Sequence, residues 1–467
     1  MEGIIKIFVD FANWFWGPPI LILIGVGGLY CTVATGFVQI RHFWYICTQT
    51  FGKMFSKPDS NDPNAVSPFS AAVAALASSI GASNIVGVPV AIAFGGPGAI
   101  FWMWVLAILG CATKYVEIVL GLAYREKNAN GEYTGGPFYY CSKGLSEYGL
   151  GPIGKFMGAW FAFFLMIEII PSIATQSVSA VQNAETLNLP PIATGVAIAV
   201  LVGLVVMGGF KRIASVTDKL VPFMAGIYLL AAVVVIILNI ANLPGALASI
   251  FVHAFTPTAA AGGFAGSTVA LALRWGAARG VYSNEAGMGT APMAHATATV
   301  DHPVRQGMWG VFEVMVDTII VCTVTALAVL TSGVWQEVGS DKAASMPSIA
   351  FSSVFGVAGD YLVTICVFLF VLSTIIVLVF YGEKQAEFLF GTAFARIWKY
   401  VYVAAILGGV FGGLEFLYQL TDFFLAMIVI PNMIAVLILA GKARSLTKEF
   451  FNTPGKYYLA DMAAKKK

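Results

Sequence analysis

One long apolar segment, residues 67–94, carries polar and flexible residues at its centre. A segment of this length is expected to cross a bilayer as a helix, because about 20 apolar residues span the hydrocarbon region. Its central stretch reads Ala-Ser-Ser-Ile-Gly-Ala-Ser-Asn-Ile-Val-Gly-Val-Pro from Ala77 to Pro89. Ser, Asn and Gly in the middle of a spanning segment predict that the helix is broken there.

A broken helix at this depth constrains the function. Backbone N–H and C=O groups that leave helical geometry in hydrocarbon lose their partners, and this is tolerated only where they line a cavity or bind something. Many secondary transporters build binding sites in this way, with half-helix N-termini facing anionic groups and freed carbonyls holding cations. The segment therefore indicates a transporter. The alternative is a close helix–helix contact, for which Gly, Ala and Ser are also typical.

The composition identifies the class of protein. Of 467 residues, 58% are hydrophobic and 11% are charged, whereas soluble chains are about 25% charged. The chain is thus an all-α polytopic membrane protein with the lipid bilayer as a partner. A net charge of +2 without a basic, aromatic-rich run argues against nucleic-acid binding. The six cysteines and four histidines show no metal-ligand or disulfide spacing.

About eleven apolar stretches are suitable as transmembrane helices, and we number them I to XI. They lie at residues 14–36, 67–94, 98–123, 155–182, 191–209, 219–241, 263–283, 307–331, 361–381, 395–412 and 415–440. The first is expected to be a retained span, because Glu2 and Asp10 precede it, its apolar run exceeds that of a signal peptide, and no small-residue cleavage site follows.

Lys and Arg concentrate on one set of loops. That set carries residues 41, 53, 57, 125, 127, 143, 155, 211, 212, 219, 305, 384, 396, 399, 442, 444, 448, 456 and 465–467. The opposite set carries only Lys6 and Lys342. Because positively charged loops remain in the cytoplasm, we expect the N-terminus outside and the C-terminus inside. The short loops and tails are compatible with a prokaryotic inner membrane.

Spans II–XI divide into two groups of five. An odd number of spans per group inverts the second group relative to the first, as in inverted-repeat transporters. The predicted organisation is an N-terminal helix with a linker, a first repeat, a second repeat and a basic tail, at residues 1–66, 67–241, 242–441 and 442–467.

If span VII corresponds to span II, it should also be broken. It contains Arg-Trp-Gly-Ala-Ala-Arg-Gly from Arg274 to Gly280, where an uninterrupted apolar run would be expected. We therefore predict a break between Phe264 and Gly280.

Span IV carries a polar stripe. Its members are Glu168, Ser172, Thr175, Ser179 and Gln182, with Gln176 beside them. At about 100° per residue these positions follow one line down the helix, and a stripe with a carboxyl group at membrane depth generally faces a cavity or pathway. Hydrogen bonding between helices is the alternative. Pro171 is expected to bend this helix.

Span IX offers two adjacent hydroxyl groups, Ser373 and Thr374, in an apolar run. They lie about 100° apart on a helix and can converge on one ion from the side, and a hard cation prefers oxygen ligands. The alternative is that both hydroxyls bond to carbonyls of their own helix.

Other ionisable groups lie within the predicted spans. Glu313 and Asp317 share one face of span VIII, where like charges repel, so we expect one of them to be protonated or matched by Arg. In span III, Lys114 and Glu117 are expected to pair locally or to reach toward the interface. Asp422 and Asn432 in span XI are expected to be buried structural hydrogen-bonding residues.

Several motifs follow one another along nearly the whole chain. They are Ser78–Gly87, Gly-Gly-Pro-Gly from Gly95, Arg-Gly-Val-Tyr-Ser-Asn-Glu-Ala-Gly-Met-Gly-Thr-Ala-Pro from Arg279, Tyr-Gly-Glu-Lys from Tyr381 and Ile-Pro-Asn from Ile430. Together they resemble the signatures of the alanine or glycine:cation symporter family. The resemblance implies a LeuT-like fold of two inverted five-helix repeats, here with an extra N-terminal helix, and sodium-driven uptake of a small amino acid by alternating access.

The resemblance also implies the site residues. The carboxylate of the amino acid would be received by the break in span II, at Gly81, Ala82, Ser83 and Asn84. Sodium, the coupling ion, would be held by the carbonyls near Ala77 and Ile80 and the hydroxyls of Ser373 and Thr374. No organic cofactor is implied.

The chain departs from the family pattern near this site. Span II carries Gly-Ala-Ser-Asn from Gly81 in place of Gly-Thr-Gly-Asn. Ala174 stands where members carry a Gln, and Gln176 follows two residues later. Leu378 replaces a bulky Trp one turn after Thr374, which would widen the pocket. We therefore expect a specificity that differs from the usual alanine or glycine.

Glu168 and Arg274 stand where small or apolar residues would be expected. Each is costly alone in the membrane, so we predict that the two face each other near the midplane. The pair is either structural or part of the substrate site, with Arg274 binding a second carboxylate or Glu168 binding an amine.

Three other functions compete with sodium symport. A proton-coupled amino acid carrier would use Glu168 or Asp317 as its titrating group. A passive channel or facilitator needs a continuous polar pore, and only span IV carries such a stripe. An enzyme is not indicated, because no G-x-S-x-G or H-E-x-x-H motif is present at a suitable depth. The sequence does not determine an oligomeric state.

Overall fold

The computed structural model describes residues 10–12, 14–54, 66–128, 131–185, 187–260, 262–411 and 414–464. Within these ranges the chain is almost entirely helical, and its strands form one short antiparallel hairpin, β1 (Glu126–Lys127) and β2 (Tyr133–Thr134). The all-α class predicted from the sequence is confirmed.

The helices, with η denoting 3₁₀- and π-helical segments, follow in chain order. The first part of the chain contains α2 (Pro18–Ile20), η1 (Leu21–Val26), α3 (Gly27–Ala34), α4 (Val38–Arg41), α5 (Phe43–Gln49), η2 (Phe51–Lys53), α6 (Pro68–Ser79), η3 (Ser83–Gly87), α7 (Val88–Gly95), α8 (Gly98–Ala123), α9 (Pro137–Tyr139), η4 (Tyr140–Gly144), η5 (Leu145–Tyr148), α10 (Gly151–Glu185), α11 (Pro191–Val206), α12 (Gly209–Leu238), η6 (Ile240–Asn242) and α13 (Leu243–His253). The remainder contains α14 (Val269–Asn284), α15 (Ala291–His295), α16 (Pro303–Val314), η7 (Met315–Cys322), α17 (Thr323–Ser332), α18 (Val334–Glu337), η8 (Ser340–Ser345), α19 (Met346–Phe355), α20 (Val357–Phe390), α21 (Thr392–Phe411), α22 (Leu414–Asn452) and α23 (Tyr457–Ala464).

Seven helices of the described chain are long and apolar enough to cross a membrane. An eighth is added when α6 and the η3–α7 pair count as one bent span. Three shorter apolar helices cover Pro18–Ala34, Pro191–Val206 and Ile240–His253. Every predicted span contains helix, but length and apolarity alone give fewer spans than the eleven expected. The polytopic class is confirmed at this coarser level.

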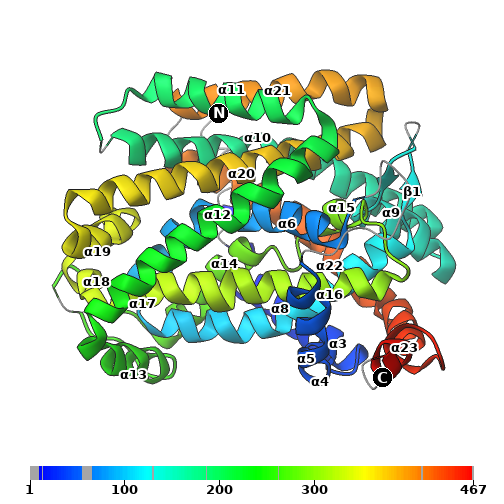
Figure 1. Ribbon diagram of the computed structural model, residues 1–467, viewed down its shortest axis with the longest axis horizontal. Helices are drawn as coiled ribbons and strands as arrows, with labels where there is room; N and C mark the ends of the chain where they lie inside the picture. The colour runs from blue at the N-terminus through cyan, green and yellow to red at the C-terminus, as the bar shows by residue number, and fades with distance from the viewer. Residues whose placement is uncertain are drawn as a thin grey trace.

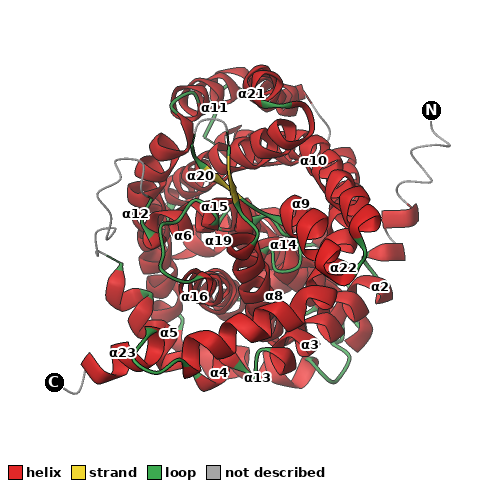
Figure 2. Ribbon diagram, turned by 90° about the vertical axis from the view of Figure 1, so that its right-hand side faces the viewer, coloured by secondary structure: helices red, strands yellow, loops and turns green. Residues whose placement is uncertain are grey.

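The long helices run side by side along the molecule (Figure 1). α10 packs against α20, α21 and α22, while α8 packs against α14 and α16. α13, α18 and α19 lie at one end, and β1, α9 and α23 lie at the other. Viewed from the second end, α6 and α15 lie near the middle of the bundle (Figure 2), in keeping with their runs of buried residues. Loops predicted to share one side of the membrane therefore gather at the same end.

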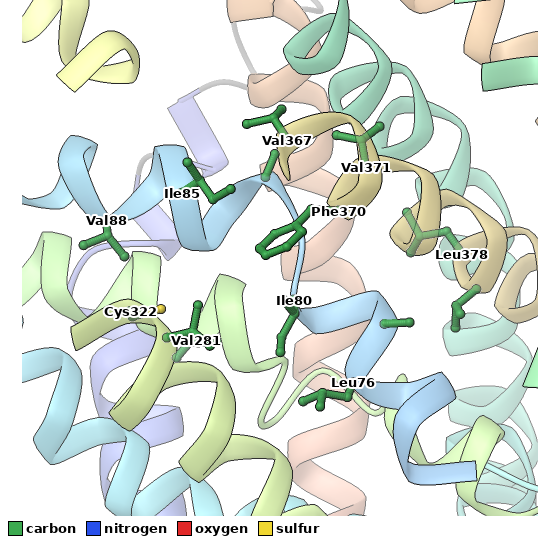
Figure 3. Close-up of a cluster of buried hydrophobic side chains, with 14 of the residues drawn as sticks. Leu76, Ile80, Ile85, Val88, Val281, Cys322, Val367, Phe370, Val371 and Leu378 are labelled. Carbon is green, nitrogen blue, oxygen red and sulfur yellow. The ribbon is translucent and has the colours of Figure 1, made fainter. Parts of the chain in front are cut away.

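The predicted break in span II is present. α6 ends at Ser79, Ile80 leaves helical geometry with ψ of 88°, and helix resumes with η3. The two halves are bent by 49° relative to each other. Figure 3 shows the thin stretch of chain between Ile80 and Ile85, with apolar side chains packed on both sides of it.

Side-chain caps help to start the two helices that lead into the breaks. Ser67 Oγ accepts the backbone N–H of Ser70 (2.9 Å) at the start of α6. Thr268 Oγ1 accepts the N–H of Leu271 (3.2 Å) at the start of α14. Each cap satisfies one of the donors that the first helical turn leaves without a partner.

The break in span VII lies later than predicted. α14 runs without interruption through the Arg274–Gly280 stretch. The chain leaves helical geometry only at Glu285, which has φ of 57°, and becomes helical again with α15. The predicted position between Phe264 and Gly280 is therefore wrong.

The glycines of α14 serve close helix packing. A Cβ added to Gly276 would collide with the backbone of Ala99 in α8, and a Cβ added to Gly280 would lie 3.1 Å from Cγ of Met103. Glycine on one face of a helix lets a neighbouring membrane helix approach closely. The same residue type that suggested a break therefore reflects a contact between α14 and α8.

Buried charges join several helices. Lys114 Nζ of α8 lies 3.0 Å from Glu313 of α16 and donates to the carbonyl of Asn284 at 2.8 Å. His295 of α15 contacts the other carboxylate oxygen of Glu313. The side chains of Lys114, Glu313 and His295 are fully buried. Glu313 is thus matched by Lys and His rather than by Arg, and Lys114 does not pair with a residue of its own helix.

Replacing Lys114 by Met is expected to destabilise the protein, because loss of one partner of a buried ion pair costs about 3–5 kcal/mol. Lys442→Met is the matched control, since its pair with Glu147 is exposed and such pairs contribute at most about 1 kcal/mol. The apparent melting temperature of the purified protein in detergent measures the effect. Equal losses in the two variants would contradict the expectation.

Candidate functional site

A cavity lies between the breaks of spans II and VII, and we call it the inner cavity. Its volume is about 40 Å³. Its main polar lining residues are Glu168, Ser172, Gln176, Glu285, Thr290 and Thr374. Its apolar lining residues are Ile169, Met288, Leu378 and Leu425.

Five of the residues predicted to form the site line the inner cavity: Ser83, Glu168, Gln176, Thr374 and Leu378. Gly81 lies immediately beside it. A Cβ added to this glycine would lie 2.7 Å from Thr374 Oγ1 and 3.6 Å from the side-chain amide of Gln176. The cavity therefore depends on glycine at this position.

Five residues predicted for the substrate site are not among those that line the cavity: Gly81, Ala82, Asn84, Ala174 and Arg274. Ala174 faces α21, where a Cβ added to Gly409 would lie 3.0 Å from Cα of Ala174. Ala82 is buried within the break of span II, immediately before η3. Ala174 therefore does not provide the side-chain amide of the Gln in the family pattern. The amide that lines the cavity belongs to Gln176.

Asn84 braces the break of span II. Its Oδ1 accepts the backbone N–H of Gly81 (3.0 Å), and its Nδ2 donates to Ser283 (3.0 Å) and Asp317 (2.7 Å). Asp317 also accepts from the hydroxyls of Ser283 (2.9 Å) and Thr318 (2.7 Å). Asn84 is fully buried and belongs to the framework that holds spans II, VII and VIII together.

The break of span VII places Glu285 at the cavity wall. Its carboxylate accepts hydrogen bonds from Thr290 and from Ser78 of α6 (3.3 Å). Asn432 of α22 donates to the carbonyl of Gly287 (2.8 Å) and to Glu117 (2.5 Å). Side chains from α6 and α22 thus hydrogen-bond to polar groups of this non-helical stretch.

The candidate cation ligands are only partly brought together. Thr374 Oγ1 donates to the carbonyl of Ala77 at 3.0 Å, so α20 and the C-terminal turn of α6 meet at these atoms. Ile80 follows at the end of that turn. Ser373 instead donates to the carbonyl of Phe370 (2.9 Å) and faces the sulfur of Met224 (3.4 Å). Of the two hydroxyls, Thr374 has the orientation that suits a cation shared with span II.

The polar stripe of span IV is divided between two roles. Glu168, Ser172 and Gln176 line the inner cavity at steps of four residues. Thr175 and Ser179 donate to carbonyls of their own helix, at 2.8 and 3.0 Å. The face that meets the cavity is therefore rotated slightly from the predicted line, toward Gln176.

A second cavity lies beside the inner one, and we call it the outer cavity. Arg274, Trp275, Arg279, Asp422 and Tyr282 line it, together with Ala12, Trp16 and Ala278. The guanidinium carbons of Arg274 and Arg279 lie 5.9 and 5.4 Å from the ring centre of Trp275. Tyr282 lines both cavities.

The predicted pair of Glu168 and Arg274 is not formed. Glu168 lines the inner cavity and accepts a hydrogen bond from Ser172, whereas Arg274 lines the outer cavity beside Asp422. Both residues are described, and no ion pair joins them. They occupy different cavities because Arg274 lies eleven residues before the break of span VII, at Glu285.

Sequence reasoning missed the role of Glu285, Thr290 and Tyr282. All three lie in the motif that begins at Arg279, but nothing in their spacing showed that the helix ends at Glu285. The useful signal was a carboxyl group between glycines in an apolar region, because such a group needs hydrogen-bond donors that a regular helix does not provide.

Comparisons with known proteins agree with this architecture. A model of the sodium:alanine symporter family matches residues 1–460. The chain is 47% identical to the uncharacterized transporter YflA of Bacillus subtilis, covering 99% of this chain and 96% of the relative. It is 38% identical to the sodium/alanine symporter AgcS of Methanococcus maripaludis, covering 95% and 97%.

A further relative is the probable sodium/glutamine symporter GlnT of Bacillus subtilis, with 35% identity over 96% of this chain and 91% of the relative. Each of these matches extends over more than nine-tenths of both chains. The protein is therefore an amino-acid transporter rather than an enzyme, and it belongs to the sodium:alanine symporter family.

Proposed function

We propose that this protein couples the inward movement of sodium to the uptake of an amino acid by alternating access. The observation that carries the proposal is the inner cavity, which lies where the broken spans II and VII meet. Such breaks expose polar N–H and C=O groups of the backbone at membrane depth. Ion-coupled transporters bind their ions and substrates with groups of this kind.

The substrate carboxylate binds at the N-terminus of η3, near Gly81 and Ser83. The positive end of a half-helix stabilises an anion there, and the absence of a Cβ on Gly81 leaves room for it. The α-ammonium group faces Glu285, whose carboxylate lies on the opposite broken helix. A zwitterion thus connects the two breaks.

Sodium binds between α6 and α20. The carbonyls of Ala77 and Ile80 and the hydroxyl of Thr374 are its ligands, and Ser373 joins them after a change of its rotamer. Inward movement of sodium releases about 2.3 kcal/mol per charge for each 100 mV of membrane potential. That energy drives uptake only if ion and substrate stabilise the same closed state.

The fold is of LeuT-like type, with inverted repeats at residues 67–241 and 242–441 between the N-terminal part (1–66) and the basic tail (442–467). The packing pattern supports this division. α10 packs against α21 and α22, and α20 packs in the same way against α11 and α12. Likewise α8 contacts α14 and α22, and α16 and α17 contact α6 and α12. When spans II–VI are matched in order with spans VII–XI, each of these contacts made by one group has a counterpart made by the other.

The N-terminus lies outside and the C-terminus lies in the cytoplasm. The end that carries β1, α9 and α23 is the one with the Lys- and Arg-rich loops (Figure 1), and positively charged loops face the cytoplasm. With this orientation the outer cavity lies on the extracellular side of the inner cavity, and Tyr282 stands between them.

Proton coupling is the second candidate, because Glu168 lines the inner cavity without a basic partner among the described residues. Uptake of labelled alanine and glutamine into proteoliposomes separates the candidates. Sodium symport requires uptake that depends on an imposed sodium gradient and persists without a proton gradient. Uptake driven by a proton gradient alone would establish the rival, and flux without any gradient dependence would indicate a facilitator.

Replacing Thr374 by Val is expected to weaken sodium dependence, because it removes one oxygen ligand and keeps the side-chain shape. The sodium concentration for half-maximal uptake should rise by about tenfold, equivalent to about 1.4 kcal/mol. Thr331→Val is the control, since its buried hydroxyl donates to Leu327 of its own helix. An unchanged sodium dependence in Thr374→Val would remove this residue from the ion site.

Replacing Gly81 by Ala is expected to weaken substrate binding. The new Cβ would lie 2.7 Å from Thr374 Oγ1, and overpacking of this kind costs about 1–3 kcal/mol. Gly203→Ala is the matched control, because no atom lies within 4 Å of a Cβ at that glycine of α11. Binding measured in detergent, alongside melting temperature, should show a loss in the first variant alone. Equal affinities in the two variants would place the substrate elsewhere.

A further inference from the structure

The inner cavity has an unbalanced charge. Two carboxyl groups, Glu168 and Glu285, line it, and none of the described residues that line it is Lys, Arg or His. The proposed function uses one positive group, the α-ammonium, at Glu285. Glu168 is then left without a positive partner, although a lone charge at membrane depth is costly.

Glu168 lies deep in the protein. It is at the midpoint of α10 and 2% exposed, and one of its carboxylate oxygens accepts the hydroxyl of Ser172. Glu313, also buried, is matched by Lys114 and His295. Glu168 differs from Glu313 in that the described protein provides no counter-charge for it, which leaves its carboxyl group available to a positively charged group that enters the cavity.

Gln176 gives a second, independent sign of a ligand. It is 7% exposed and lines the same cavity, and its side-chain carbonyl oxygen has no hydrogen-bond partner in the described structure. A buried amide of this kind is normally hydrogen-bonded. The cavity therefore contains, at the level of Gly81, a side-chain carbonyl oxygen that can accept a hydrogen bond from a ligand.

The spacing along α10 defines the length of that partner. Because Ser172 donates to Glu168, the carboxylate lies near Ser172, one turn and about 6 Å along the axis from Gln176. A substrate held by its carboxylate at Gly81 reaches this level only with an extended side chain. Ile169, Leu378 and other apolar lining residues suit the methylene groups of such a chain.

We propose that Glu168 selects amino acids whose side chain ends in a positively charged amino group, by pairing with that group while the substrate backbone lies between the two breaks. This inference rests on the proposed function and names its substrate class. A neutral amide side chain would leave the Glu168 charge unbalanced, whereas an ammonium group balances it and donates hydrogen bonds to it. Ornithine has the required length and charge.

The test compares ornithine with norvaline, which has the same carbon chain without the terminal amino group. Binding of both is measured to the purified full-length protein in detergent with sodium present. The wild type should bind ornithine at least about 30-fold more tightly than norvaline. This ratio is at the lower end of the range expected for a buried pair of opposite charges. In Glu168→Gln that advantage should disappear, while the affinity for norvaline should change by less than about threefold.

Two further variants keep the result interpretable. Glu185→Gln removes a carboxylate from the exposed end of the same helix and should retain the preference for ornithine. Glu168→Asp keeps the charge and should retain a reduced preference, so a folding defect of Glu168→Gln, visible in its melting temperature, would not prevent a decision. The ratio of the ornithine and norvaline affinities is also measured on the wild type, and this part of the test depends on no variant.

The outcomes separate this inference from the proposed function. Equal affinities of the wild type for ornithine and norvaline, or equal losses for both in Glu168→Gln, would overturn the role of Glu168 and leave amino-acid binding intact. A Glu168→Gln variant that changes only the pH dependence of uptake would also overturn it, in favour of a proton acceptor. Failure of the wild type to bind any amino acid tested would overturn the proposed function itself.

Discussion

The structure depends on satisfying backbone polarity where two membrane helices are interrupted. Water is absent at this depth, so other parts of the protein must provide the partners. Asn84 accepts the free N–H of Gly81, Asn432 donates to the carbonyl of Gly287, and Lys114 donates to the carbonyl of Asn284. Each brace connects a break to a different helix or helix half, which fixes the two breaks relative to the bundle.

Ionisable groups in this protein fall into two sets. Lys114 and Glu313 form an ion pair inside the framework, and His295 hydrogen-bonds to Glu313, so these residues join α8, α15 and α16. Glu168 and Glu285 face the inner cavity instead, and their charge is available to a substrate or ion. The outer cavity, with Arg274, Arg279 and Asp422, has the opposite excess of charge. The two neighbouring cavities therefore carry opposite charge.

Small residues in the membrane segments have different structural reasons. Gly81 leaves space at the inner cavity next to Thr374, whereas Gly276 allows α14 to approach the backbone of α8. Gly287 and Gly289 adopt positive φ in the break of span VII, which residues with a Cβ rarely do. The sequence does not distinguish these reasons, and the polar, glycine-containing stretch from Arg274 to Gly280 predicts a break where the structure has a helix contact.

The sequence by itself determined the helical, polytopic membrane class, the break of span II and the family, because hydropathy, helix-breaking residues and motifs are local properties of the chain. Polarity in an apolar helix also indicated that Glu168 faces a cavity, and the family resemblance pointed to Gln176 and Thr374, which line the same cavity. Only the tertiary structure decided where span VII breaks, that Lys114 matches Glu313, and that Arg274 and Glu168 lie in separate cavities. These features depend on which helices, distant in the sequence, lie side by side. The amino-acid sequence alone does not give the distances between them.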